Sequence, residues 1–277
     1  MMNFAGNGYI KLMCRYIIVE MDHVPYRVKK ILPLLVLCSF ILTTGFSPID
    51  QVQNRYETKG KIPEPVYSMR HNEKKIKVCY LTFDDGPSES SEKIMGLLNQ
   101  YHAKATFFLL GKHILKFPEV VRNMKREDFT IGLHGVSHDY KKLYSSEKSV
   151  VEDMIDDQNI TMEVTGLRTP FIRTPYGSYP FMKESYRRAV VNHGFIMWDW
   201  NVDSYDWRYR DWRFVQQTIK QIKKVEKEGQ VPVLLLHDRT YTLRHIESLL
   251  LYLQQHKYQM KGIDASMNPL QFPLKKQ

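Results

Sequence analysis

The chain has 277 residues, enough for one α/β domain of about 200 to 250 residues. Hydrophobic residues make up 43% and charged residues 25%, ordinary values that exclude a wholly disordered chain. The formal net charge of +10 favours contact with a polyanion such as anionic lipid or an acidic cell wall. Nucleic acid is a disfavoured partner, because no compact basic run is interleaved with aromatic residues as in single-strand binders.

Residues 1–46 are predicted to form an export signal or a membrane anchor. Three basic residues precede an apolar run over 31–42, and small residues follow at 43–45. Extended to residue 46, the run is still shorter than the roughly 20 residues that a spanning helix needs, which favours a signal. The small-residue site is weak, so retention as a membrane anchor is the alternative. We therefore expect the protein at the cell surface or cell wall, either secreted or attached to the membrane through this segment.

The rest of the chain is predicted to be a linker followed by one α/β domain. Residues 47–75 are polar, contain three prolines and lack periodicity, which predicts a linker or an arm. Strands are predicted at 78–83, 105–110, 130–133, 171–173, 195–198 and 231–236, and helices at 89–101, within 112–126, and at 146–164, 180–192, 212–227 and 243–255. This alternation predicts parallel strands, in a barrel or a doubly wound sheet. Either fold places its chemistry at the carboxyl ends of the strands.

Two adjacent carboxylates, Asp84 and Asp85, end the first predicted strand within the sequence Thr-Phe-Asp-Asp-Gly-Pro. Burying both is costly without a cation or a positively charged partner. Neighbouring strand residues point to opposite faces, but the Gly-Pro turn could bring both into one pocket, one to bind metal and the other to act as base. By itself the motif favours a surface turn, because Asp and Gly are common in turns.

Two histidines, His134 and His138, follow the strand predicted at 130–133. Imidazoles four residues apart can face one side of a helical turn and share a metal, although this spacing alone is a weak signal. With an Asp at another strand end they form a His-His-carboxylate set, which leaves one metal position open for water. Such a set is typical of a catalytic metal site.

Three further predicted strands also end in polar or aromatic clusters. Arg173 could neutralise a carboxylate such as Asp84, or form a surface ion pair beside a Pro-Tyr-Gly turn. All four tryptophans lie between residues 198 and 212, where they could pack against sugar rings, although core packing is the commoner use of aromatic residues. His237 follows an apolar strand, where a lone histidine is more often structural. Five clusters at five strand ends converge on one face, and this coincidence favours an active site.

These five segments together resemble the polysaccharide deacetylases of carbohydrate esterase family four, which contain the NodB homology domain. The resemblance covers residues 76–264 and leaves a C-terminal tail at 265–277. It implies an α/β fold, a distorted (β/α) barrel of the polysaccharide deacetylase type, and a divalent metal, zinc first, with cobalt or nickel also accepted by such donors.

The implied activity is hydrolysis of the acetamide of N-acetylated amino sugars in a polysaccharide. Peptidoglycan is the favoured polymer, because the chain is predicted to be exported and is basic. Chitin oligosaccharides or another surface polysaccharide come next. A non-catalytic carbohydrate-binding protein on the same fold is the alternative from another class. No protein partner is predicted.

The resemblance implies roles in proton transfer for residues at four strand ends. Asp84 is similar to the general base that activates water, and Arg173 to the residue that holds this base. Asp203 is similar to the carboxylate that tethers the arginine, with Asp206 ranked second for that role. His237 is similar to the general acid that protonates the leaving amine, a task that suits an imidazole.

The resemblance also implies a metal site and a substrate pocket. One residue departs from the family pattern: the family usually has Ser or Thr directly after the first metal histidine, and this chain has Gly135. That hydroxyl supports the loop rather than the metal, so metal binding is expected to persist. The implied metal ligands are Asp85, His134 and His138. The implied substrate contacts are the backbone N–H of Tyr176 toward the oxyanion, Trp207 in the pocket wall and Leu235 beside the acetyl group.

Overall fold

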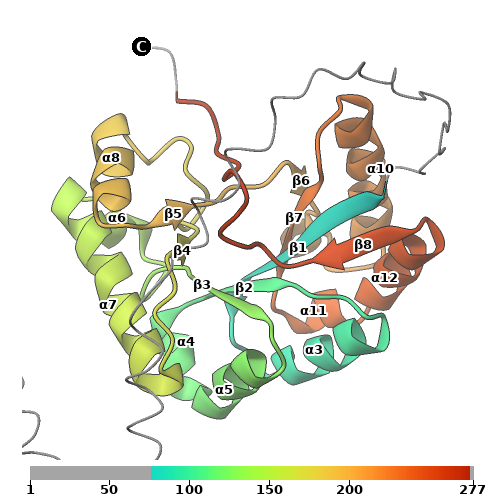
Figure 1. The fold of residues 1–277 in the computed structure, drawn as a ribbon, viewed down its shortest axis with the longest axis horizontal. Helices are drawn as coiled ribbons and strands as arrows, with labels where there is room; N and C mark the ends of the chain where they lie inside the picture. The colour runs from blue at the N-terminus through green and yellow to red at the C-terminus, as the bar shows by residue number, and fades with distance from the viewer. Residues whose placement is uncertain (1–75, 275–277) are drawn as a thin grey trace, which may run out of the picture. The chain divides into compact units, whose positions relative to one another are not determined.

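The computed structural model describes residues 76–274; the predicted export segment, the arm and the last three residues lie outside this range. Seven parallel strands form a sheet in the order β5-β4-β3-β2-β1-β7-β6, and β8 pairs with the beginning of β1 (Figure 1). The strands are β1 (Lys77–Gly86), β2 (Thr106–Leu109), β3 (Thr130–Leu133), β4 (Phe171–Ile172), β5 (Ile196–Met197), β6 (Val202–Asp203), β7 (Val233–His237) and β8 (Tyr258–Lys261).

Helices connect the strands and surround the outside of the curved sheet (Figure 1). They are α3 (Ser91–Gln100), α4 (Gly111–Lys116), α5 (Pro118–Arg126), α6 (Tyr140–Leu143), α7 (Glu147–Thr165), α8 (Glu184–Asn192), α9 (Asp206–Tyr209), α10 (Arg213–Lys227), α11 (Thr240–Leu243) and α12 (Ile246–Gln255). Between residues 76 and 274, no helix is long and apolar enough to cross a membrane. The predicted parallel α/β fold, a distorted barrel, is confirmed.

Local signals determine where the longest described helix, α7, begins and ends. The Ser146 side chain accepts a hydrogen bond from the Ser149 N–H, which satisfies one of the free donors at the helix start. Gly166 ends the helix in the left-handed conformation that glycine adopts without steric cost. By contrast, the sequence pattern does not predict the short strands β6 and β8.

The alternation of side chains along β1 separates the apolar core from the site. Leu81 and Phe83 are fully buried in the main apolar cluster, where Phe83 stacks on Phe107 of β2 with ring centroids 5.0 Å apart. Thr82 and Asp84 point to the opposite face of the strand. The core therefore lies under the helices, and the inner face of the sheet carries the polar groups.

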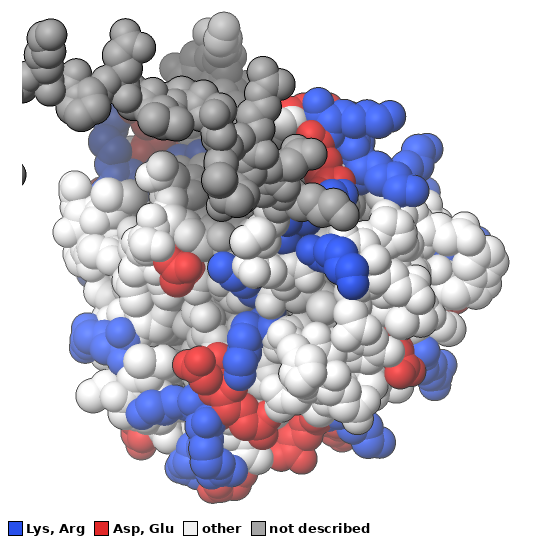
Figure 2. Space-filling view, turned by 45° about the vertical axis from the view of Figure 1, so that its right-hand side comes forward, with Lys and Arg blue, Asp and Glu red and all other residues white. Residues whose placement is uncertain are grey.

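The positive charge is distributed over the surface that Figure 2 shows. Lys and Arg side chains lie interspersed with Asp and Glu on this face and do not gather into one patch. The excess of positive charge therefore attracts anions in a general way here, and the face presents no single cationic groove.

Candidate active site

Nine of the ten predicted site residues line one cavity of about 420 Å³ at the carboxyl ends of the strands. A volume of this order suits a ligand of the size of a sugar unit. The tenth, Arg173, lies behind the cavity wall and is fully buried. Trp200 also lines the cavity, although the sequence assigned it no specific role. The lining residues are Asp84, Asp85, His134, His138, Tyr176, Trp200, Asp203, Trp207, Leu235 and His237.

A backbone irregularity at the end of β1 brings both adjacent carboxylates into this cavity. Regular alternation would send Asp84 and Asp85 to opposite faces. The pairing of β1 with β2 shifts register between Asp84 and Gly86, and Asp85 adopts a φ of +67°. This shift has the character of a β-bulge, which re-aims side chains at functional sites. It resolves the choice between a surface turn and a pocket in favour of the pocket.

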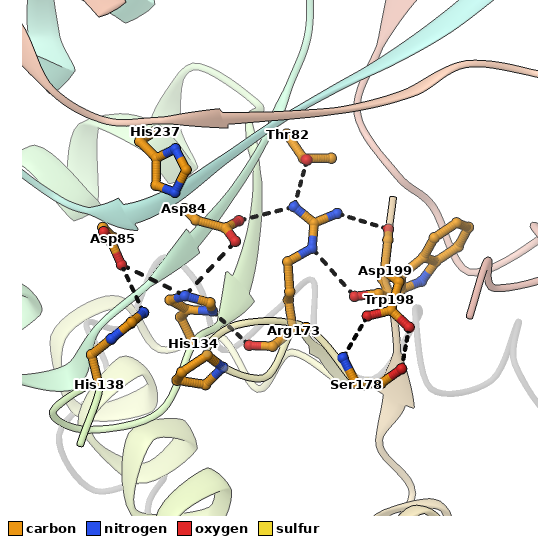
Figure 3. A network of polar contacts seen from close by, with 12 residues as sticks. Thr82, Asp84, Asp85, His134, His138, Arg173, Ser178, Trp198, Asp199 and His237 are labelled. Carbon is orange, nitrogen blue, oxygen red and sulfur yellow. Dashed lines mark hydrogen bonds and ion pairs between the residues drawn. The ribbon is translucent and has the colours of Figure 1, made fainter. Parts of the chain in front are cut away.

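Arg173 holds Asp84 from behind (Figure 3). Its Nη1 lies 2.9 Å from Asp84 Oδ1 and also donates to the Thr82 hydroxyl, while the guanidinium carbon lies 4.3 Å from the ring centroid of Phe108. Its Nε and Nη2 donate to the carbonyl groups of Trp198 and Asp199, at 3.2 and 3.0 Å. All three nitrogens of the guanidinium group are thus fixed by hydrogen bonds. Asp84 therefore has a buried and oriented positive partner.

The predicted carboxylate tether on Arg173 is wrong. Among the described residues the hydrogen bonds of Arg173 include neither Asp203 nor Asp206. Arg173 follows β4, whereas Asp203 ends β6, and the strands β3, β2, β1 and β7 lie between them in the sheet. Backbone carbonyl groups next to β5, the direct neighbour of β4, occupy the donors instead.

Asp206 pairs with His237, a contact that the sequence did not predict. Asp206 Oδ1 lies 2.7 Å from His237 Nδ1, and Oδ2 accepts the His237 N–H at 2.8 Å. Burial lowers the pKa of His237, but the charge and hydrogen bond of Asp206 outweigh it and raise the pKa to about 9. Burial likewise opposes ionisation of Asp206, yet His237 lowers the pKa of this carboxyl. The pair supplies a protonated imidazole at neutral pH.

Asp85, His134 and His138 form a compact set of donors that could hold a metal. Asp85 Oδ1 lies 3.6 Å from His134 Nε2 and 3.5 Å from His138 Nε2, and the three donor atoms lie within 4.8 Å of one another. Burial raises the pKa of Asp85, but the charges of His134, His237, His138 and Arg239 together lower it, which favours the carboxylate.

The orientation of these donors fits a divalent cation. Asp85 Oδ1 is buried and has no hydrogen-bond partner among the described residues, an arrangement that is costly unless a cation satisfies the oxygen. His134 Nδ1 lies 2.6 Å from the Arg173 carbonyl oxygen, so Nδ1 carries the proton and Nε2 presents its lone pair to the cluster. Two imidazoles and one carboxylate match the donor set of catalytic zinc sites.

The remaining predicted substrate contacts lie around the mouth of the cavity. Tyr176 has a φ of +66°, and its N–H has no acceptor among the described hydrogen bonds, so it is free to bind an oxygen. The ring of Tyr176 lies 4.7 Å from that of His138. Leu235 is buried in the wall two residues before His237, on the same face of β7, and Trp207 is half-exposed.

Arg239 is a further residue of the site that the sequence did not single out. Its Nη2 lies 3.0 Å from Asp85 Oδ2, so the second oxygen of this carboxylate has an ionic partner of its own. The only sequence signal for a role of Arg239 in the site was its position two residues after His237. This signal is weak, because a charged residue after a strand is common on protein surfaces.

The fold and the cavity together define a class of α/β-barrel hydrolase, in which a carboxylate and a histidine flank a His-His-Asp cluster. The model of the polysaccharide deacetylase family matches residues 71–198. A peptidoglycan-N-acetylglucosamine deacetylase of Bacillus cereus is 34% identical over 73% of this chain and 76% of its own length. The chain belongs to the polysaccharide deacetylase family, whose members are hydrolases of carbon–nitrogen bonds other than peptide bonds.

Other relatives and solved structures agree with this assignment. The peptidoglycan-N-acetylmuramic acid deacetylase PdaC of Bacillus subtilis is 28% identical over 69% of this chain and 39% of its own length. The crystal structure of the polysaccharide deacetylase Bc1974 from Bacillus cereus superposes with a TM-score of 0.63 at 33% identity. That similarity covers 72% of this chain and 96% of the other.

Proposed function

We propose that the protein removes acetyl groups from N-acetylated amino sugars of peptidoglycan, outside the cytoplasm, with zinc in the Asp85–His134–His138 site. The observation that carries the proposal is the cavity itself: a carboxylate held by Arg173 and a protonated His237 flank a set of metal donors. The polymer is supported by the relatives named for N-acetylglucosamine and N-acetylmuramic acid deacetylation of peptidoglycan. Export is supported by the apolar segment near the N-terminus.

Asp84 is the general base in this proposal. Its carboxylate accepts a proton from water as the water oxygen forms a bond to the acetyl carbonyl carbon. Arg173 keeps the carboxylate oriented, so that no reorganisation is needed during the step. A divalent metal, when bound, acts as a Lewis acid that lowers the pKa of water and polarises the carbonyl group. The N–H of Tyr176 donates to the oxyanion that develops on the carbonyl oxygen.

His237 is the general acid. Asp84 and His237 are register partners on the adjacent strands β1 and β7, so base and acid reach the substrate from neighbouring positions. His237 donates its proton to the sugar nitrogen as the carbon–nitrogen bond breaks, and the products are acetate and the free amino sugar. Leu235 and Trp207 contact the acetyl methyl and the sugar ring.

Acetate release by the full chain tests this function. The parent is incubated with zinc and either N-acetylated peptidoglycan or chitotetraose, and Asp84→Asn is compared with it. We expect release from peptidoglycan and a loss of about 100- to 10,000-fold in Asp84→Asn, because the general base is removed.

Each arm of this experiment has a distinct contrary result. Release from chitotetraose alone would overturn the peptidoglycan assignment and leave the site roles intact. Equal activity of Asp84→Asn and the parent would contradict the role of the base. Binding of either glycan without acetate release would show a carbohydrate-binding protein in place of an enzyme.

A further inference from the structure

Two carboxylates of helix α7 hold the backbone of residues 134–138, which we call the metal-ligand loop. Asp153 Oδ2 accepts the N–H of Val136 at 2.9 Å, and Asp157 Oδ2 accepts the N–H of His134 at 3.0 Å. Asp153 and Asp157 lie four residues apart on one face of α7. Two N–H groups of the loop, those of His134 and Val136, therefore bind side chains of a single helix.

The carbonyl groups of the same loop bind a second helix. The N–H of Gly111 donates to the Gly135 carbonyl at 3.1 Å, and the N–H of Lys112 donates to the Val136 carbonyl at 3.0 Å. Both donors lie in the first turn of α4, where N–H groups have no partner within the helix. The loop is thus held between α7 and α4, and its geometry depends on both contacts.

Gly135 leaves the space that Asp153 occupies. A Cβ atom at residue 135 would lie 2.5 Å from Asp153 Oδ2, closer than any stable contact, and Gly135 has a φ of +84°. Any side chain at this position would displace the carboxylate that binds the Val136 N–H, and would also be strained in the left-handed region. The identity of residue 135 and the position of Asp153 are therefore coupled.

We propose that Asp153 is a positioning residue for the metal site: through the space that Gly135 leaves open, it holds the Val136 N–H and so keeps His134 and His138 at binding distance from Asp85. The proposal rests on the metal site of the proposed function. His138 is expected to depend more on this support than His134, because its side chain is 26% exposed and that of His134 only 2%. Asp157, which is fully buried, supports the His134 end of the loop.

Zinc affinity of the full chain tests the role of Asp153, measured by competition with a chelating indicator. Asp153→Ala is expected to weaken zinc binding by about 10-fold or more, the usual effect of removing a group that orients a metal ligand. Asp153→Asn keeps an acceptor for the Val136 N–H and is expected to stay within about threefold of the parent. Asp156→Ala changes an exposed carboxylate of the same helix and serves as the matched control.

Circular dichroism and metal-free thermal unfolding of each variant separate positioning from loss of the fold. A folded Asp153→Ala variant with the affinity of the parent would overturn the proposal. An Asp156→Ala variant as impaired as Asp153→Ala would overturn it too, because helix charge in general would then explain the effect.

A double-mutant cycle tests the coupling to Gly135. Gly135→Ser in the parent introduces both the contact with Asp153 and the backbone strain, whereas in Asp153→Ala only the strain remains. We expect Gly135→Ser to weaken zinc binding at least about threefold less in the Asp153→Ala background than in the parent. Equal effects in both backgrounds would contradict the coupling.

The zinc experiment and the acetate assay can fail separately. The parent could bind zinc, and the double-mutant cycle could give the expected result, while no acetate is released. The proposed function would then be wrong and the role of Asp153 would stand. If the parent binds no zinc, the role of Asp153 is overturned together with the metal site.

Discussion

At the scale of single residues, the charge of His237 depends on one buried carboxylate, that of Asp206. Asp206 Oδ1 lies 2.7 Å from His237 Nδ1. Asp206 Oδ2 accepts hydrogen bonds from the backbone N–H of His237 and from the Thr242 hydroxyl, the latter at 2.6 Å. Because His237 must be protonated to act as an acid, activity should fall as the pH rises through its pKa of about 9. The pH at which activity falls on the alkaline side, the alkaline limit, therefore measures how strongly Asp206 raises the pKa of His237.

Asp206→Asn should move the alkaline limit of kcat/KM to lower pH. The substitution removes the charge that raises the pKa of His237, so the protonated form is lost earlier as pH increases, and activity at pH 8 should fall more than activity at pH 6. Thr242→Val removes a hydrogen bond but no charge and is the control. An unchanged alkaline limit in a folded Asp206→Asn variant would contradict the assignment of His237 as the acid.

At the scale of elements, the last described segment of the chain packs against a residue of the cavity wall. The N–H of Phe272 donates to Asp199 Oδ2 at 2.7 Å, and the Asp199 N–H donates to the Leu270 carbonyl at 2.7 Å. The ring of Phe272 packs edge-on against Trp200, with centroids 4.9 Å apart, and Trp200 lines the cavity. A segment that the sequence suggested was a tail thus supports the loop after β5.

Phe272→Ala should destabilise the fold by about 1–2 kcal/mol, because a half-buried aromatic contact is lost. It should also raise KM more than it lowers kcat, since Trp200 loses its support while Asp84 and His237 do not. Urea unfolding and steady-state kinetics measure the two effects. Leu274→Ala, two residues further on at a residue that is 41% exposed, should change neither. A Phe272→Ala variant with parental KM would show that Trp200 is held without this contact.

At the scale of the whole molecule, metal binding should stabilise the folded state. The donors Asp85, His134 and His138 come from the ends of β1 and β3, and they meet only in the native fold. A ligand that binds only the folded state adds to the free energy of unfolding in proportion to the logarithm of its concentration over Kd.

Zinc at about 100 times its Kd should add about 2.7 kcal/mol and raise the Tm by about 5–10 °C. A chelator should reverse the shift and abolish acetate release, and added zinc should restore both. His138→Ala should remove the shift without lowering the metal-free Tm by a similar amount, because its side chain is partly exposed. A parental zinc shift in His138→Ala would contradict its role as a ligand.

The sequence alone determined most of the strands and helices, although not the short strands β6 and β8, and it determined which residues gather at the strand ends. Strand runs, capping residues and the five polar motifs are local signals, and parallel strands bring their carboxyl ends to one edge regardless of detail. Asp84, Asp85, His134, His138 and His237 line one cavity, as expected from strand ends that converge on one face.

Only the tertiary structure decided which of these side chains contact one another. Asp203 and Asp206 both lay near a strand end, and nothing local distinguished a partner on β4 from one on β7. The order of strands in the sheet placed Asp206 beside His237 and left Arg173 to backbone carbonyl groups. The support of the metal-ligand loop by Asp153 likewise depends on how α7 packs near β3, and such contacts between distant segments arise from packing.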